Sequence, residues 1–161
     1  MRAPLSRTAP AFVEMAHRIV WAGAATVDAD GRPWSRVLHP LWTWDGTELT
    51  GIVATSPLSP KADHLARHPH ISFTYWHPAQ DTCSAMCDAE WDPSPEGRAA
   101  GWEALKSAPE PVGYDPGIIL TWEDPTSPTF GILRLRPWRL YVLPGSVTTG
   151  DGGDVLSWQQ G

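Results

Sequence analysis

The sequence has 161 residues, of which 42% are hydrophobic and 19% charged, and this balance fits one domain with a sizeable core and excludes disorder throughout. Its 12 basic and 18 acidic residues give a formal net charge of −6 and form no basic run, so we expect no nucleic-acid partner. No apolar run is long enough to cross a bilayer and no signal peptide is recognisable, so we expect no membrane partner and a cytoplasmic location.

The first third of the chain predicts a helix followed by three antiparallel strands. Thr8 is a suitable N-cap, Pro10 suits the first turn, and apolar residues then recur at helical spacing, so we expect a helix over residues 10–20. Strands are expected over residues 22–27, 34–42 and 49–55, with turns at 28–31 and 45–46 between them. A meander of this kind favours a barrel or a sandwich over a doubly wound sheet.

The rest of the chain alternates between helices and strands and ends in a segment rich in Gly and Asp. We expect one helix from Pro60 to near Arg67, another over residues 93–107, and a Pro- and Gly-rich loop over 107–117. Further strands are expected over residues 71–76, 83–91, 118–122 and 130–143. The sequence therefore predicts a mainly β fold with flanking helices, with residues 1–143 as one domain and residues 144–161 as a flexible C-terminal tail.

The segment from Thr55 to Lys61 combines the features of an anion site. Ser59 is a good N-cap and Pro60 fits the first helical position, so a helix begins here with free N–H groups. The positive end of the helix dipole then lies beside Lys61 and the hydroxyl groups of Thr55, Ser56 and Ser59. A lysine in the first turn is unfavourable for the helix by itself, and a bound phosphate would reverse that penalty.

Arg36 is the second basic candidate. It lies in the middle of the strand predicted over residues 34–42, where a half-buried guanidinium requires an anionic partner and can grip a phosphate through two parallel hydrogen bonds. Since the strands of Arg36 and Thr55 are expected to be neighbours, both residues can reach one pocket. An empty helix start, and an arginine paired with a carboxylate, are the alternative interpretations.

Six short motifs follow one another in a characteristic order. They are ATVDADGRP at residues 25–33, SRV at 35–37, SPKA at 59–62, HPHISF at 68–73, DAEW at 88–91 and LRLRPW at 133–138. Each motif is loose, but their order and spacing together are fairly specific. Over roughly residues 10–143 the chain resembles the pyridoxamine 5'-phosphate oxidase-like family of FMN-binding proteins.

The resemblance implies a six-stranded, Greek-key split β-barrel, a homodimer, and FMN bound at the dimer interface. By the match of motifs, the FMN phosphate would be held by Arg36 and Lys61, with help from Ser59 and Thr55. Three residues would run along the edge of the isoalloxazine ring by their backbone: Val37, Leu38 and Ala54.

The resemblance also implies an oxidoreductase that transfers hydride through the flavin to or from a small organic substrate. The chain ends in LYVLP at residues 140–144 and a Gly/Asp segment, without the Arg- and His-containing segment of the true oxidases, so strict vitamin-B6 oxidase activity is not expected. The alternatives are a reductase using the deazaflavin coenzyme F-420, a non-catalytic flavin-binding or stress-related module, and a dimer without cofactor. FMN ranks ahead of F-420 because an acidic chain offers little positive charge to a deazaflavin tail with several carboxylates.

No catalytic side chain is expected, because in a flavoprotein the ring performs the redox chemistry. Tyr114 and Trp138 are the candidates for walls on the substrate side, although a loop anchor and core packing are their simpler roles.

Histidines and cysteines between residues 64 and 87 are the only candidates for a metal site. His64 and His68 are one helical turn apart, whereas Cys83 and Cys87 on a strand would point the same way but lie far apart. None of these spacings matches a zinc site, so we expect no metal.

Overall fold

The computed structural model describes residues 2–161 as one antiparallel sheet with flanking helices. The helices of this part of the chain are α1 (Leu5–Ile19), α2 (Pro60–Arg67), α3 (Pro95–Ser107) and α4 (Gly145–Thr149), with a short 3-10 helix over Pro116–Ile118. The strands are β1 (Ala22–Val27), β2 (Pro33–Leu38), β3 (Leu41–Trp44), β4 (Leu49–Thr55), β5 (His70–Trp76), β6 (Thr82–Asp92), β7 (Gly131–Leu143) and β8 (Leu156–Gln159). No helix within residues 2–161 has the length and apolar character needed to cross a bilayer.

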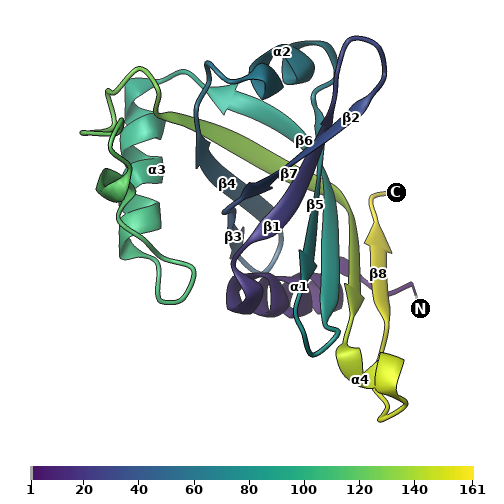
Figure 1. Cartoon of the computed structure of the whole chain (residues 1–161). Coiled ribbons are helices and arrows are strands. Elements are labelled where there is room, and N and C mark those ends of the chain that lie inside the picture. The colour runs from purple at the N-terminus through teal and green to yellow at the C-terminus, as the bar shows by residue number, and fades with distance from the viewer. Residues whose placement is uncertain (1) are drawn as a thin grey trace.

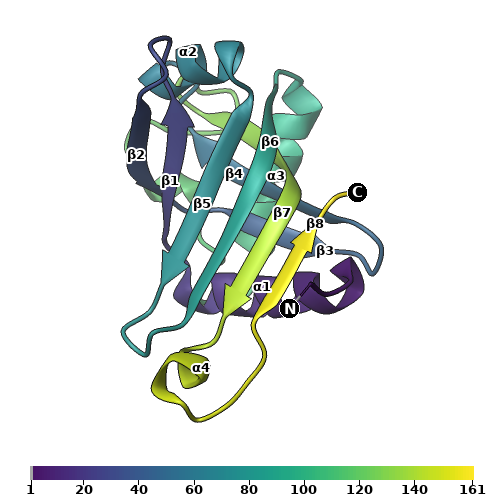
Figure 2. The same cartoon turned by 90° about the vertical axis from the view of Figure 1, so that its right-hand side faces the viewer.

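A single stretch of chain closes the sheet into a barrel. The strand order is β2-β1-β5-β6-β7-β4-β3, and β8 is added beside β7. β2 and β3 therefore lie at opposite edges of the sheet, although only His39 and Pro40 separate them in the sequence. Because Leu38 pairs with β1 and Leu41 pairs with β4, this short link draws the two edges together, and the sheet curls round as Figures 1 and 2 show.

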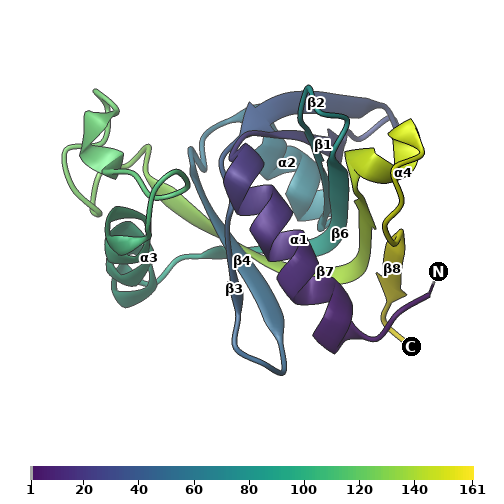
Figure 3. The ribbon, with the colours of Figure 1, turned by 90° about the horizontal axis from the view of Figure 1, so that it is seen from below.

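The main core lies between the inner face of this sheet and α1, which runs across one end of the barrel (Figure 3). The Phe12 ring packs edge-on against Trp42, with ring centroids 5.1 Å apart, and against Tyr75 at 6.1 Å. The indole N–H of Trp42 donates to the Tyr75 hydroxyl at 2.8 Å, so these polar groups are satisfied inside the core. The apolar helical face that includes Phe12 and Ala16 is therefore confirmed as the buried face of α1.

Two predicted boundaries differ from the structure for identifiable reasons. The strand predicted over residues 34–42 is broken at His39–Pro40, where Pro40 has no N–H to donate to a ladder and the chain passes from one edge of the sheet to the other. The first helix begins at Leu5 instead of residue 10, so Thr8 lies inside it and does not cap it. The buried Thr8 hydroxyl is satisfied by donating to the C=O of Pro4 at 3.1 Å.

The strand predicted over residues 118–122 is absent, and turns follow the 3-10 helix there. Figure 3 shows α3 and the loop after it standing away from the barrel wall. A second, smaller core attaches this part: Phe130 packs edge-on against Trp102 and Trp122, with centroid distances of 5.0 and 5.1 Å. Of residues 118–122, Trp122 anchors the loop in this core, whereas Ile118 and Leu120 are exposed and hold no sheet position.

Residues 144–161, predicted as a flexible tail, contain α4 and β8 and continue the sheet. β8 pairs with the end of β7: Leu156 lies opposite Val142 at one end of the ladder, and Gln159 lies opposite Arg139 at the other. Leu156 is buried, and Trp158 packs against the main core. The predicted domain boundary at residue 143 therefore falls within a continuous antiparallel sheet.

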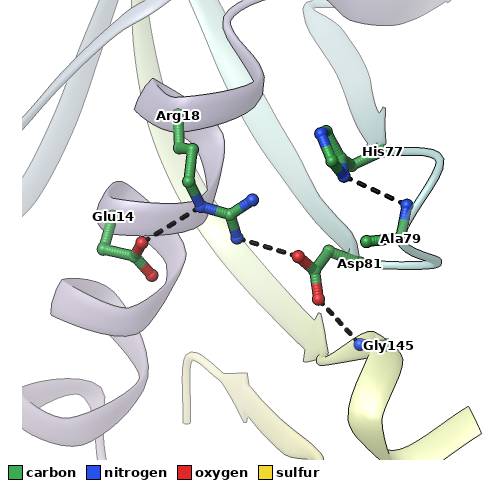
Figure 4. Close-up of polar contacts among 6 residues, drawn as sticks. All are labelled: Glu14, Arg18, His77, Ala79, Asp81 and Gly145. Carbon is green, nitrogen blue, oxygen red and sulfur yellow. Dashed lines mark hydrogen bonds and ion pairs between the residues drawn. The ribbon is translucent and has the colours of Figure 1, made fainter. Parts of the chain in front are cut away.

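The carboxylate of Asp81 ties the two ends of the chain to the β5–β6 turn (Figure 4). It accepts one hydrogen bond from the Arg18 guanidinium of α1 at 2.9 Å and one from the N–H of Gly145, at the start of α4, at 2.7 Å. Arg18 also pairs with Glu14 at 3.2 Å. The Gly145 and Arg18 hydrogen bonds hold the pKa of Asp81 below its ordinary value.

Replacing Asp81 is expected to destabilise the fold more than replacing Glu14, although both carboxylates bind Arg18. Asp81→Ala should lower the free energy of unfolding in urea by about 1–3 kcal/mol, because it removes two charge-assisted hydrogen bonds. Glu14→Gln removes one exposed ion pair and should cost less than about 0.5 kcal/mol. Because the folded state lowers the pKa of Asp81, its contribution should be present above about pH 4 and lost as the pH falls further. Equal effects of the two substitutions would contradict this role for Asp81.

Candidate functional site

The segment that joins β4 to α2 folds back on itself at one end of the barrel, beside β1 and β2 (Figure 2). Thr55 ends β4, Ser59 precedes α2, and Pro60 is the first helical residue, as predicted. The Ser59 hydroxyl makes no capping bond to the helix and donates instead to the C=O of Ser56 at 2.8 Å. The turn thus leaves the start of α2 uncapped and brings Lys61 back toward Thr55.

Lys61 is buried, with only 6% of its surface exposed. Its ammonium donates to the hydroxyl of Thr55 at 2.7 Å and to that of Ser59 at 2.6 Å, which leaves one of its three N–H donors. No carboxylate in residues 2–161 forms an ion pair with it. A buried lysine without an acidic partner is uncommon and costly, so this position favours an anion from outside the chain.

Arg36 brings a second unpaired cation to the same place. Its guanidinium donates to the C=O of Trp34 at 2.8 Å and to that of Ala24 at 3.2 Å, and within residues 2–161 it forms no ion pair. Arg36, Ser59 and Lys61 line one open hollow of about 260 Å³, together with Trp34, Ser35 and Pro60. The predicted reason for this meeting was wrong, since β2 and β4 do not pair; the two cations meet because α2 packs on β1, beside β2.

The two cations destabilise each other in the absence of an anion. Burial lowers the pKa of Lys61 to about 8, and the charge of Arg36 is the second cause of this shift. Burial also lowers the pKa of Arg36 from its ordinary value. An anion in the hollow would relieve both effects, because it favours the charged forms of both groups.

Ser56, also predicted for the site, stabilises the turn and does not line the hollow. Its hydroxyl accepts the backbone N–H of Leu58 at 3.2 Å, and its C=O accepts the Ser59 hydroxyl. Its part in the site is therefore indirect, since it fixes the turn that places Ser59.

The three residues predicted to act through their backbone lie where one side of the strand has no ladder partner, although Ala54 itself is buried and packs in the second core. Val37 and Leu38 are on β2, which pairs with β1 alone, so one side of the strand has no ladder partner. Ala54 lies on β4 beyond the last pair with β3, Leu41–Ile52, and pairs only with β7. Backbone groups on these sides have no strand to bind and can bind a ligand.

Trp34 is a residue of the site that the sequence analysis did not select. Its indole N–H donates to the Asp28 carboxylate at 2.9 Å, and its ring lies edge-on to His64 at 5.2 Å. His64 is fixed in turn, since its Nδ1 lies 2.8 Å from the Thr26 hydroxyl. The sequence did contain a signal for Trp34. Residues two apart on a strand share a face, and Trp34 precedes Arg36 by two residues, so it lies on the same face as Arg36.

The predicted substrate-side walls lie outside the hollow. The Tyr114 ring packs on His39, at the β2–β3 link, with centroids 4.5 Å apart, and burial raises the pKa of Tyr114 to about 12. Trp138 is the extra residue where the β6–β7 register shifts between the pairs Met86–Arg139 and Cys87–Pro137. Tyr114 therefore anchors its loop, and Trp138 belongs to a β-bulge.

The arginines of another hollow have acidic neighbours. A cavity of about 270 Å³ on the outer face of β6 and β7 is lined by Arg134 and Arg136, and also by Asp88 and Glu90. Arg134 is further paired with Asp92. The hollow beside Lys61 differs because its lining contains two cations and no acid.

No three side chains suited to a metal ion converge anywhere between residues 2 and 161. Cys83 and Cys87 are buried free thiols, and burial raises the pKa of both. His64 binds the Thr26 hydroxyl.

No protein-family model and no curated protein matches the sequence. Solved structures do match. A pyridoxamine 5'-phosphate oxidase-related, FMN-binding protein from Nostoc punctiforme is 22% identical with a TM-score of 0.61, over 88% of this chain and 85% of that one. A Clostridium acetobutylicum protein related to general stress protein 26, of the pyridoxinephosphate oxidase family, is 10% identical with a TM-score of 0.66, over 96% and 94% of the two chains.

An F420 reductase also shares the architecture, with 17% identity and a TM-score of 0.56 over 80% of this chain and 94% of that one. Identities this low show the fold alone, and the fold is common to proteins described with different cofactors. The resemblance predicted from the motifs is confirmed at this level: across most of its length the chain has the split-barrel fold of the pyridoxamine 5'-phosphate oxidase-related, FMN-binding proteins.

Proposed function

We propose that this chain binds FMN, with the phosphate in the hollow beside Lys61, and acts as a flavin-dependent oxidoreductase on a small organic substrate. One observation carries the proposal: a buried ammonium and a neighbouring guanidinium line one hollow, and neither has an acidic partner in residues 2–161. The fold shared with FMN-binding proteins supports it.

The residues present fit a flavin phosphate. A phosphate monoester carries close to two negative charges at neutral pH, which Arg36 and Lys61 match. Lys61 has one donor left, and the Arg36 guanidinium, which donates two of its five N–H groups to backbone carbonyls, has three left for phosphate oxygens. The backbones of Val37, Leu38 and Ala54, which lack a strand partner on one side, would hold the edge of the ring.

A bound flavin would supply the hydride donor or acceptor. The six residues that line the hollow include neither a carboxylate nor an imidazole. The chain's own contribution at this place is therefore to bind the cofactor through its phosphate and to orient it along β2.

The deazaflavin coenzyme F-420 is the second candidate, because an F420 reductase shares the fold. A net charge of −6 and two cations in the hollow are a poor match for a tail with several carboxylates, which keeps FMN first. A non-catalytic flavin-binding module is the third candidate, and the likeness to a protein related to a general stress protein supports it.

We also propose that two copies of the chain form a homodimer around the cofactor. Large apolar side chains are exposed near the hollow, on β2 at Val37 and in the turn at Leu58. Others are exposed on the loop after α3, where Leu120 is 98% exposed. Exposed apolar side chains of this size favour burial against a second protein surface. A second copy of the chain would also shield a cofactor bound at the open edge of the sheet from solvent.

Removing either cation should weaken FMN binding. Lys61→Met and Arg36→Met are each expected to raise the dissociation constant for FMN about 10- to 100-fold, the effect of one charge-assisted hydrogen bond, in a fluorescence titration. Arg32→Met is the matched control, since Arg32 is exposed, pairs with Asp30 and does not line the hollow; it should change the constant by less than about threefold. Unchanged FMN affinity in both hollow variants would exclude this phosphate site.

FMN affinity should fall as the pH rises above 8. Only the charged ammonium attracts phosphate, and the pKa of Lys61 in the free protein is about 8, so the attractive form is lost above that pH. The phosphate itself stays dianionic between pH 7 and 9 because its second pKa is about 6. Titrations across this range should show the decline in the wild-type protein and a flat, weaker profile in Lys61→Met. A flat wild-type profile would contradict the assignment to Lys61.

The dimer should dissociate when its apolar surface is charged. Light scattering coupled to size exclusion is expected to give twice the chain mass for the wild-type protein and a single chain mass for Val37→Asp. Trp76→Asp is the control, since Trp76 is also exposed but lies on β5, away from the hollow, and should leave the mass unchanged. A wild-type protein that is monomeric with flavin bound would overturn the proposal.

A further inference from the structure

The hollow beside Lys61 is open to solvent, with a volume of about 260 Å³, so a phosphate held by the two cations can carry further groups. Trp34 and Pro60 add apolar surface to a lining whose other members are polar or charged. The composition therefore suits a ligand in which an apolar, planar group is attached to the phosphate.

Trp34 is held in place although half of it is exposed to solvent (49%). Its N–H bond to Asp28 and its edge contact with His64 fix the ring from two sides. Asp28 is itself fixed by the backbone N–H groups of Arg32 and Asp30, at 2.9 Å each, and these bonds help to hold its pKa below the ordinary value. An exposed aromatic ring that is ordered in advance loses little entropy when another ring stacks on it.

The position of Trp34 along β2 determines which part of a bound ligand can contact its ring. Val37 and Leu38 follow Arg36 on the strand, whereas Trp34 precedes Arg36 by two residues, about 7 Å. If the isoalloxazine ring lies along Val37 and Leu38, Trp34 is on the other side of the phosphate. A group stacked on Trp34 is then joined to the phosphate from the side opposite the flavin.

We propose that Trp34 forms an aromatic subsite for the adenine of a flavin dinucleotide, so that FAD binds this chain more tightly than FMN does. The inference rests on the phosphate position proposed above, and the FMN half of the dinucleotide keeps that position. The two phosphates of FAD carry one negative charge each and match Arg36 and Lys61 as well as a single dianionic phosphate does. Stacking of one base on an aromatic side chain is worth enough to make the affinity for FAD about 5- to 100-fold higher than that for FMN.

The test compares FMN and FAD on the same purified full-length protein. Dissociation constants for both are measured by calorimetric titration for the wild type, Trp34→Leu, Trp34→Phe and the control Trp76→Leu, whose indole is 58% exposed and lies outside the hollow. FAD should bind the wild type and Trp76→Leu about 5- to 100-fold more tightly than FMN. In Trp34→Leu the two flavins should bind with equal affinity, so that the ratio of the two dissociation constants falls to about 1, and Trp34→Phe, which keeps an aromatic face, should retain part of the preference for FAD.

Equal affinities for FMN and FAD in the wild type would overturn the subsite, as would an FAD preference that survives in Trp34→Leu. Lys61→Met separates this failure from failure of the proposed function. If that variant weakens both ligands while the wild type does not distinguish them, the phosphate site stands and the adenine subsite falls. If it weakens neither, the phosphate site falls and the adenine subsite with it.

Discussion

A buried ammonium without an acidic partner is the interaction on which this account of the molecule depends. Lys61 is bonded to two neutral hydroxyl groups and faces the guanidinium of Arg36, and its pKa is lowered as a result. Several arginines on the surface do form ion pairs with carboxylates, so the chain does not lack acids that could neutralise a lysine. That it leaves these two cations unpaired in one hollow is what an anion-binding function requires, and stability alone gives no reason for it.

The barrel closure makes this arrangement possible. β2 and β3 follow one another in the sequence but lie at opposite edges of the sheet. The strand that carries Arg36, β2, is therefore an edge strand, and its backbone groups are unpaired on one side. Pro60 starts α2 where the chain turns back, and Lys61 follows it under the hydroxyl of Thr55. Trp34 and His64 come from β2 and α2 and hold these two elements together beside the cations. If this open edge receives the proposed ligand it also needs cover, which would connect the site to the exposed apolar residues and to the proposed dimer.

Local signals in the sequence were sufficient for the elements that form the site. The Ser59–Pro60 helix start and the strand before it follow from short-range rules, and the motif order predicted the fold class. The absence of a carboxylate partner for Arg36 within residues 2–161 does not, since a paired arginine was an equally open interpretation. Tertiary constraints were not readable in this way. Nothing local indicates that Pro40 divides a strand between two sheet edges, that residues 118–122 pack through Trp122, or that Leu156 and Trp158 return to the sheet. Trp34 was missed because an exposed tryptophan in a chain with ten of them carries little information until its neighbours are known.

The most direct test of the central claim is to compare FMN with riboflavin, which has the same ring system and no phosphate. If the phosphate in the hollow of Lys61 and Arg36 anchors the flavin, calorimetric titration should give an affinity for FMN at least about 100-fold higher than for riboflavin, since two charged contacts are lost together. Equal affinities for the two flavins would show that the ring alone carries the binding, and would contradict the account at its foundation.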